Sequence, residues 1–408
     1  MRKIFLIMLA CFVIAFLGFS YTISGYVDDA NQSAIPGVNI LVNGEPFTVS
    51  NTDGSWNVQS NGTVKIEPYL KWWKFDPQEV TLDNSQTNVD FVGSFTGPKL
   101  KEITVGTSPD AGIFDPKNGM VYIADNLDNS IVVINGEKDI FENIFQNIPV
   151  GVNPSALAIN SNTGLMYIAN ESITAFYSIG IYNTVKKRFE GSIPLNYAPG
   201  GIGIDQKKDT LYVTESYNST YYGNGVDVID LKTNSVIGRI NVGNDPCCVF
   251  VDQDTNKIYV VNNYDNTLSV IDGNNVIATI PVGQAPLSVC ADKDKIYVAN
   301  SGDNTVSVIS ASTYELLKTI PVGVHPSAVA IDSKDDLVFV ANTDSNSVSV
   351  IDGSTDHVIS VIPDPYSPYS LVVNSAMKKL YMINQKSNNV TVVDYNGISL
   401  TMHFRFGT

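Results

Sequence analysis

The chain is poor in the residues that most often build reactive centres. Its 408 residues include four cysteines, three histidines and three tryptophans. The histidines, His325, His357 and His403, fall at unrelated points of the sequence, so they predict no metal site. Without Cys11, only three cysteines remain, which excludes a full disulfide framework. No C-x-x-C-H or G-x-S-x-G run occurs, which argues against covalent haem and against an α/β-hydrolase nucleophile.

Positive charge is scarce as well. The chain has 25 Lys and Arg residues against 41 Asp and Glu residues, a formal net charge of −16. Such an acidic surface repels phosphate backbones and anionic lipid. We therefore expect no nucleic-acid partner.

Only one apolar run is long enough to matter for a membrane. Arg2 and Lys3 precede the run Ile4 to Phe19, which is shorter than the roughly 20 residues of a membrane-spanning helix. We interpret residues 1–20 as a cleaved secretory signal peptide and expect a secreted, periplasmic or cell-surface protein with no membrane span after cleavage. The alternatives are an uncleaved anchor and lipidation at Cys11, which lies inside the apolar run.

Residues 21–95 predict a small antiparallel β-sandwich. Short alternating strands such as Ile23 to Val27 and Val38 to Val42 are separated by turn signals such as Asn43-Gly44 and Asp53-Gly54. The stretches ISGYVDDANQSAIPGVNILVNG, NTDGSWNV and KWWKFDPQEVTL resemble the carboxypeptidase regulatory-like family, which implies a transthyretin-like sandwich without catalytic residues. Trp72 departs from that family, which tends to have glycine there. It predicts either an exposed partner contact or packing on the sandwich edge.

A repeat fills the rest of the chain. One proline recurs every 40 to 47 residues, at Pro109, Pro154, Pro199, Pro246, Pro286, Pro326 and Pro368. A period near 40 residues with several short strands per unit is typical of a β-propeller. We predict an all-β chain: a signal peptide at 1–20, a sandwich at 21–95, a linker at 96–99 and a seven-bladed propeller at 100–408.

One repeat shows how a blade is expected to form. The fourth repeat predicts strands over 248–251, 257–261, 267–271 and 276–281. The segments YVAN from Tyr297 and NTVSVI from Asn304 resemble the YVTN-repeat family of propellers, which implies a fold common in envelope proteins and no single activity. The repeated asparagines are interpreted as structural turn residues. Either Leu100 to Val105 or Ile398 to Phe406 could supply the outer strand that closes the ring.

The candidate ligand-binding residues interrupt the repeat on the face where the loops open around the channel mouth. Glu215 replaces the usual asparagine in the third repeat, and tyrosines gather in the surrounding loops. Tyrosine is large and amphipathic, which suits protein or glycan recognition. The predicted site residues are Tyr197, Glu215, Tyr217, Tyr221, Tyr222, Tyr264, His325, Tyr366 and Tyr369.

These observations favour a non-catalytic binding or scaffold protein of the cell envelope, with a protein or glycan partner and no cofactor or metal. Whether it is an enzyme stays open. The alternative is a lactonase-type or other hydrolase, or an oxidoreductase, acting at the channel mouth with Glu215, Asp110 or His325. A quinone enzyme is disfavoured because the repeats contain no tryptophan. The adjacent Cys247 and Cys248 predict buried small residues, with a strained disulfide as the alternative.

Overall fold

The computed structural model describes residues 21–30, 32–60, 62–145, 151–171, 177–216, 223–292, 294–396 and 398. Across these ranges the chain forms β-strands and one short 3₁₀ helix, Gln385–Ser387, and no α-helix. This confirms the prediction of an all-β protein. No helix in these ranges has the length and apolar character needed to cross a membrane. The predicted signal peptide lies outside the described residues.

The N-terminal region forms two four-stranded sheets. The first has the order β4-β1-β8-β6 and the second the order β3-β2-β5-β7. Their strands are β1 (Tyr21–Asp29), β2 (Asn39–Val42), β3 (Glu45–Val49), β4 (Ser55–Ser60), β5 (Val64–Tyr69), β6 (Trp73–Asp76), β7 (Val80–Leu82) and β8 (Phe91–Phe95). Side chains from both sheets are buried in one hydrophobic cluster, with Ile23, Ile40, Trp56 and Phe91 among its least exposed members. Alternation of apolar and polar residues along β4 and β5 buries one face of each strand and leaves the other toward water.

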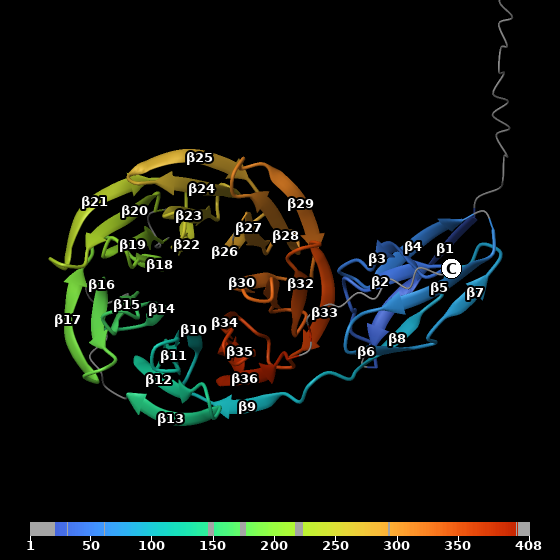
Figure 1. Cartoon of the computed structure of the whole chain (residues 1–408), viewed down its shortest axis with the longest axis horizontal. Helices are drawn as coiled ribbons and strands as arrows, with labels where there is room; N and C mark the ends of the chain where they lie inside the picture. The colour runs from blue at the N-terminus through green and yellow to red at the C-terminus, as the bar shows by residue number, and fades with distance from the viewer. Residues whose placement is uncertain are drawn as a thin grey trace, which may run out of the picture.

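The repeats form seven further four-stranded sheets in the described part of the chain, arranged as a ring (Figure 1). We number these sheets 1 to 7 in chain order. In sheets 1 to 6 the strands lie in sequence order from the inside of the ring outward, and in sheet 7 the outer strand is β9, which comes before the others in the sequence. Sheets 1 to 4 contain β10 (Pro109–Asp115), β11 (Met120–Asp125), β12 (Ser130–Asn135), β13 (Ile140–Phe145); β14 (Pro154–Asn160), β15 (Leu165–Asn170), β16 (Ser178–Asn183), β17 (Arg188–Pro194); β18 (Pro199–Asp205), β19 (Thr210–Glu215), β20 (Gly225–Asp230), β21 (Ser235–Asn241); β22 (Pro246–Val251), β23 (Lys257–Asn262), β24 (Thr267–Asp272) and β25 (Asn275–Pro281). Sheets 5 to 7 contain β26 (Pro286–Asp292), β27 (Lys295–Asn300), β28 (Thr305–Ser310), β29 (Leu316–Pro321); β30 (Pro326–Asp332), β31 (Leu337–Asn342), β32 (Ser347–Asp352), β33 (His357–Pro363); β34 (Ser370–Asn374), β35 (Lys379–Asn384), β36 (Asn389–Asp394) and β9 (Lys101–Thr104).

The ring closes between its two ends. β9 comes before every other strand of the repeats, yet it pairs with β36 as the outer strand of sheet 7. Ile103 of β9 lies opposite Val390 and is buried. Of the two closing strands that the sequence allowed, the structure therefore has the one from the beginning of the repeats.

The second strand of most sheets ends in a buried polar residue that joins it to the third strand. Asn300 donates hydrogen bonds from Nδ2 to the Thr305 and Ser307 hydroxyls, at 3.0 and 2.9 Å. The same pattern recurs at Asn262, Asn342 and Asn384. These side chains have the structural role that was predicted from the repeat. However, they lie at strand ends, and the turn position with positive φ belongs to residues such as Asn304 (φ 57°).

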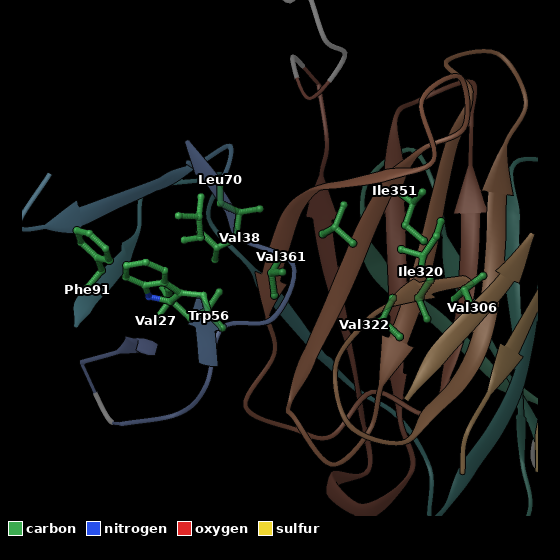
Figure 2. Packing of buried hydrophobic residues seen from close by; sticks show 14 of the residues in the cluster. Val27, Val38, Trp56, Leu70, Phe91, Val306, Ile320, Val322, Ile351 and Val361 are labelled. Atoms are coloured by element: carbon green, nitrogen blue, oxygen red, sulfur yellow. The ribbon is translucent and has the colours of Figure 1, made fainter. Parts of the chain in front are cut away.

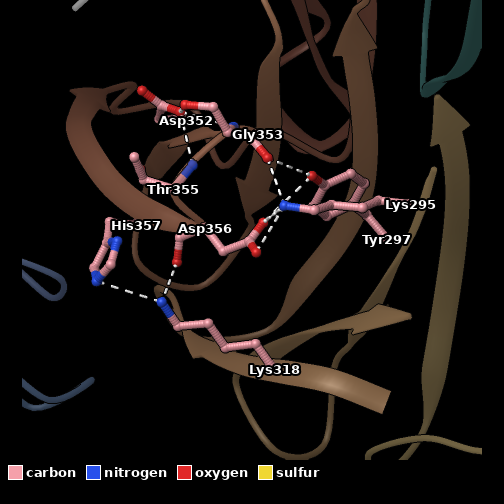
Figure 3. Close-up of polar contacts among 9 residues, drawn as sticks. Lys295, Tyr297, Lys318, Asp352, Gly353, Thr355, Asp356 and His357 are labelled. Atoms are coloured by element: carbon pink, nitrogen blue, oxygen red, sulfur yellow. Dashed lines mark hydrogen bonds and ion pairs between the residues drawn. The ribbon is translucent and has the colours of Figure 1, made fainter. Parts of the chain in front are cut away.

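Neighbouring sheets are also joined by polar contacts at the opposite ends of the second strands. Lys295 of β27 donates to both carboxylate oxygens of Asp356 at 2.8 Å, and Tyr297 lies against the same hairpin of sheet 6 (Figure 3). In sheet 7, Lys379 and Tyr381 contact Asp139 of sheet 1 in the same way. We call this arrangement the inter-sheet clamp. Each clamp pairs a buried or half-buried lysine with an aspartate of the next sheet.

The N-terminal sheets dock on β33, the outer strand of sheet 6 (Figure 1). The Lys71 amide donates to the Ile359 carbonyl at 2.9 Å, and Trp73 Nε1 donates to the Val361 carbonyl at 2.8 Å. Val361 belongs to the same buried cluster as the N-terminal core (Figure 2). Trp72 packs partly buried against the neighbouring cluster that includes Ile359. It therefore contacts the ring of repeats.

Candidate functional site

The repeated proline is the first residue of six inner strands and lies two residues before the seventh, β34. The residues that follow these prolines therefore lie at the start of the inner strands, around the centre of the ring at one end. They are Asp110, Ser155, Gly200, Cys247, Leu287, Ser327 and Tyr369. Most are small, which is expected where seven strands converge. Asp110 and Tyr369 differ from the rest. Asp110 lies in β10 and Tyr369 directly precedes β34, and these two strands contact each other.

Asp110 is the centre of a polar group at this end of the ring. Its Oδ1 atom accepts a hydrogen bond of 2.8 Å from Gln385 Nε2. The pKa of the Asp110 carboxyl is raised to about 7, mainly by burial and also by the nearby Glu171 carboxylate, while the Gln385 hydrogen bond opposes the rise. Burial also raises the pKa of Glu171, against the effect of the neighbouring Ser155 hydroxyl. The two acids therefore interact electrostatically in a poorly hydrated place.

Tyr369 completes this group. Burial raises the pKa of its phenol to about 12, with the charges of Asp110, Glu171 and Cys247 as further causes. Those charges act on Tyr369 only because the groups lie near one another. The side chain is still 36% exposed, so part of its ring faces solvent. We call Asp110, Glu171, Tyr369 and Gln385 the central cluster.

The central cluster combines acceptors, donors and an aromatic surface. With a pKa near 7, Asp110 changes protonation around neutral pH and can either donate or accept a hydrogen bond. Gln385 and Tyr369 add an amide and a hydroxyl. Within the described residues no group of three His, Cys, Asp or Glu side chains has the arrangement of a metal site. The cluster is suited to binding a neutral or cationic polar ligand.

Glu215, predicted from the sequence to be a ligand contact, is buried. Its carboxylate is 1% exposed and accepts two hydrogen bonds from Arg239, from Nε at 2.5 Å and from Nη2 at 2.6 Å. Arg239 also lies 5.9 Å from the centre of the Tyr197 ring, a cation–π distance. Glu215, Arg239 and Tyr197 thus form one unit in and beside sheet 3, apart from the central cluster.

The other predicted residues are spread around the same face. Tyr264 is 63% exposed in the turn between β23 and β24. Tyr366 donates to Glu102 Oε1 at 2.7 Å. His325 occupies the positive-φ position before the repeated proline, and its amide donates to Asn304 Oδ1 at 2.9 Å. The remaining predicted residues, Tyr217, Tyr221 and Tyr222, lie outside the described residues.

Of the predicted ligand-binding residues, only Tyr369 belongs to the central cluster. Asp110 was named from the sequence for the enzyme alternative, and the other two members were not singled out. Glu171 and Gln385 each follow the last residue of a second strand. In the other sheets that position is occupied by Asn126, Ser216, Asn263, Ser301 and Thr343. Asn263, for example, donates to the Pro286 carbonyl of the next sheet at 2.9 Å. An ionised carboxylate cannot donate this hydrogen bond. The glutamate at position 171 was therefore the sequence signal that could have identified the central cluster.

The cysteines lie in inner strands and are free thiols in the described part of the chain. Cys247 Sγ lies 3.5 Å from the Pro286 carbonyl oxygen. Burial raises the pKa of Cys247 well above its usual range, and that of Cys248 as well. Thiols of this kind are poor nucleophiles. The disulfide considered from the sequence is not formed, and the thiols pack as small side chains.

The comparisons with known proteins agree with the geometry of the ring. The profile of a family described as YNCE-like beta-propeller matches residues 276–408. A Kuenenia stuttgartiensis hydrazine synthase chain is 18% identical, with a TM-score of 0.63 over 72% of this chain and 97% of that one. The WD40 repeats of RRP9 are 15% identical, with a TM-score of 0.62 over 73% and 98%. No curated protein matches the sequence.

The repeats therefore form a β-propeller. At these identities the likeness to solved structures concerns the fold alone. Propellers of one fold carry unrelated activities, so the function has to be argued from the residues of the site.

Proposed function

We propose that this chain is an exported binding or scaffold protein that recognises a protein or glycan partner through the loop face of its propeller. The observation that carries the proposal is the convergence of Asp110, Glu171, Tyr369 and Gln385 at one end of the ring. Hydroxyl, amide and carboxyl groups beside an aromatic ring are the chemistry with which proteins bind sugars and polar peptide segments. The partner would be an envelope or extracellular component.

The finer architecture belongs to the same proposal. Each four-stranded sheet of the repeats would be one blade of a seven-bladed propeller at 100–408. Residues 21–95 would be a carboxypeptidase regulatory-like sandwich, joined by a linker at 96–99, and residues 1–20 a cleaved signal peptide. The docking of the N-terminal sheets on β33 supports a fixed second contact region, in place of a loose spacer.

The proposal is tested by capture. Residues 21–408 are immobilised, and the host's envelope extract and a glycan array are applied in parallel. Tyr369→Ala and Gln385→Ala should lose saturable capture, because they remove the aromatic surface and the amide of the central cluster. Tyr69→Ala, which removes a 49% exposed tyrosine from an N-terminal sheet, is the matched control.

Two results would count against the proposal. Saturable capture that all variants retain, including a Tyr221→Ala, Tyr222→Ala double variant, would place recognition elsewhere. Absence of saturable capture from both sources would argue against a binding module of this kind.

A second candidate, a hydrolase, is favoured by one observation. The Asp110 carboxyl, with a pKa of about 7 beside Glu171, is suited to general acid–base work near neutral pH. A panel of lactones and glycosides tests this candidate. Turnover by the parent protein that Asp110→Asn abolishes would support an enzyme, and absence of turnover across the panel would leave binding as the better proposal.

A further inference from the structure

A cleft separates the N-terminal sheets from the outer strands of sheets 5 and 6. It measures about 290 Å³ and lies on the side of the propeller, away from the central cluster. Phe47 and Thr48 of β3 form one wall, and Ile320 of β29 and Val358 of β33 form the other. Lys318 and His357 bring two nitrogen groups into the lining. This volume is near the lower end of the range for small-molecule sites.

The charge of Lys318 is not neutralised by direct pairing with a carboxylate of the described residues. Its ammonium donates to the backbone carbonyl of Asp356 at 2.7 Å and lies 3.4 Å from His357 Nε2 (Figure 3). Asp356 also lines the cleft, and its carboxylate is held by Lys295 through both oxygens at 2.8 Å. Burial lowers the pKa of Lys318, so an anion bound beside it would stabilise the charged form. In a chain with a net charge of −16, such a cationic spot is unusual.

The rest of the cleft is largely apolar. Phe47 is 57% exposed, which is high for a phenylalanine in a folded region. Ile320, Pro321 and Val358 form the opposite surface. The lining therefore combines apolar side chains from both sides with the Lys318 ammonium.

A second lysine of the propeller, Lys101, can be compared with Lys318. Lys101 of β9 is paired with Val392, and Lys318 of β29 is paired with Val308. The two lysines therefore occupy equivalent positions in the outer strands of sheets 7 and 5. Its ammonium likewise donates to a hairpin carbonyl of the next sheet, that of Lys138, at 3.3 Å. The hydrogen bond to the hairpin is thus a shared feature of the two positions. The opposing wall formed by Phe47 and Thr48 distinguishes the Lys318 position.

We propose that this cleft is a binding site for a small carboxylate with an aromatic or other flat apolar body. The carboxylate pairs with Lys318 and accepts a further hydrogen bond from His357, and the apolar body contacts Phe47, Ile320 and Val358. The site does not depend on the function proposed for the central cluster.

The test is an NMR titration of residues 21–408 with benzoate as the probe. Benzamide, which has the same shape without the charge, is the ligand control. We expect saturable benzoate binding that weakens at least tenfold in Lys318→Met and severalfold in Phe47→Ser, with benzamide binding much more weakly than benzoate. Lys101→Met is the matched protein control, because it removes the same kind of hairpin contact and leaves the cleft intact.

These measurements distinguish a ligand-binding role of Lys318 from a purely structural one. Benzoate binding that Lys101→Met retains and Lys318→Met loses establishes the site. No saturable response to benzoate at millimolar concentration, or equal binding by the parent and Lys318→Met, overturns the proposal. If Lys318→Met fails to fold, the parent's preference for benzoate over benzamide and its loss in Phe47→Ser decide the question.

Discussion

Arg239 holds the buried carboxylate of Glu215 with two parallel hydrogen bonds, from Nε at 2.5 Å and from Nη2 at 2.6 Å. In sheets 4 to 7 the residue at the Glu215 position is an asparagine bonded to hydroxyl or amide side chains of the third strand. Sheet 3 has Gly225 and Asp227 on that strand instead. A side chain at Gly225 would collide with the guanidinium of Arg239. The third sheet has therefore exchanged a neutral hydrogen-bond network for an ion pair.

Removing the guanidinium should destabilise the protein. In Arg239→Met, Glu215 would be left buried and unpaired, and we expect the free energy of unfolding to fall by about 3 kcal/mol, measured by urea denaturation. Adding Glu215→Asn should restore most of this loss, because it removes the buried charge. If the single and double variants are equally unstable, the lost packing of Arg239, and not the unpaired charge, is the cause.

Replacing the buried Asp125 of sheet 1 with asparagine should stabilise the protein, and the gain in stability should depend on pH. Asp125 is fully buried, its Oδ1 has no hydrogen-bond partner in the described residues, and burial raises its pKa to about 7. A carboxyl whose pKa is higher folded than unfolded costs stability as the pH rises from about 4 to about 7, because the folded state binds the proton more tightly. Asp125→Asn has no such group. Its advantage over the parent should be small at pH 4 and reach about 4 kcal/mol at pH 8, because raising the pKa from about 4 to about 7 costs about 1.4 kcal/mol per pKa unit.

Urea unfolding at pH 4, 6 and 8 checks this expectation. Asp254→Asn, in an exposed hairpin, is the control and should show little pH-dependent difference from the parent. A constant difference between Asp125→Asn and the parent at all three pH values would contradict the assigned cause.

The strands of the repeats were predictable because turn chemistry recurs with them. The fourth repeat predicted strands over 248–251, 257–261, 267–271 and 276–281, and the structure has β22, β23, β24 and β25 within two residues of each boundary. Asn256 and Asn266 adopt positive φ at two of the intervening turns, and Gly273 at the third. Asparagine and glycine tolerate that conformation, so the turns could be located from the sequence.

The central cluster could not be predicted from the sequence in the same way. Asp110, Glu171, Tyr369 and Gln385 come from sheets 1, 2 and 7, and their proximity depends on the closure of the ring. The sequence left the closing strand open. It also could not show that Glu215 would be neutralised by Arg239, which lies 24 residues further on, in an outer strand. Sequence position identified the loop face, and only the tertiary structure distinguished buried from accessible side chains on it.

The joint between the N-terminal sheets and β33 should be sensitive to a single methyl group. Gly37 has φ +73°, and a Cβ there would lie 2.9 Å from Val358 Cβ. Gly37→Ala should therefore loosen the joint, with faster hydrogen exchange at the Lys71 amide, which bonds to Ile359. Gly44 has φ +86° and no atom within 4 Å of the same position. Gly44→Ala therefore introduces the same kind of backbone strain, at a residue with positive φ, without a steric collision.

Exchange measured by NMR distinguishes the two effects. Protection of the Lys71 amide should fall in Gly37→Ala and stay near the parent value in Gly44→Ala. An equal fall in both variants would assign the effect to backbone strain within the N-terminal sheets and would contradict a contact-dependent joint.

The closure of the ring by β9 depends on the burial of Ile103. Ile103 of β9 is 6% exposed and packs with side chains of sheets 1 and 7, including Val121 and Val390. Ile103→Ala should lower the free energy of unfolding by about 3 kcal/mol, since it removes buried methyl groups at the place where the two ends of the repeats meet. Thr104→Ala changes the exposed neighbour on the same strand and should cost about 0.5 kcal/mol or less. Urea denaturation of the two variants provides the comparison. If Ile103→Ala proves as mild as Thr104→Ala, β9 does not hold the ring closed, and the outer strand of sheet 7 must come from the other segment that the sequence allowed, Ile398 to Phe406.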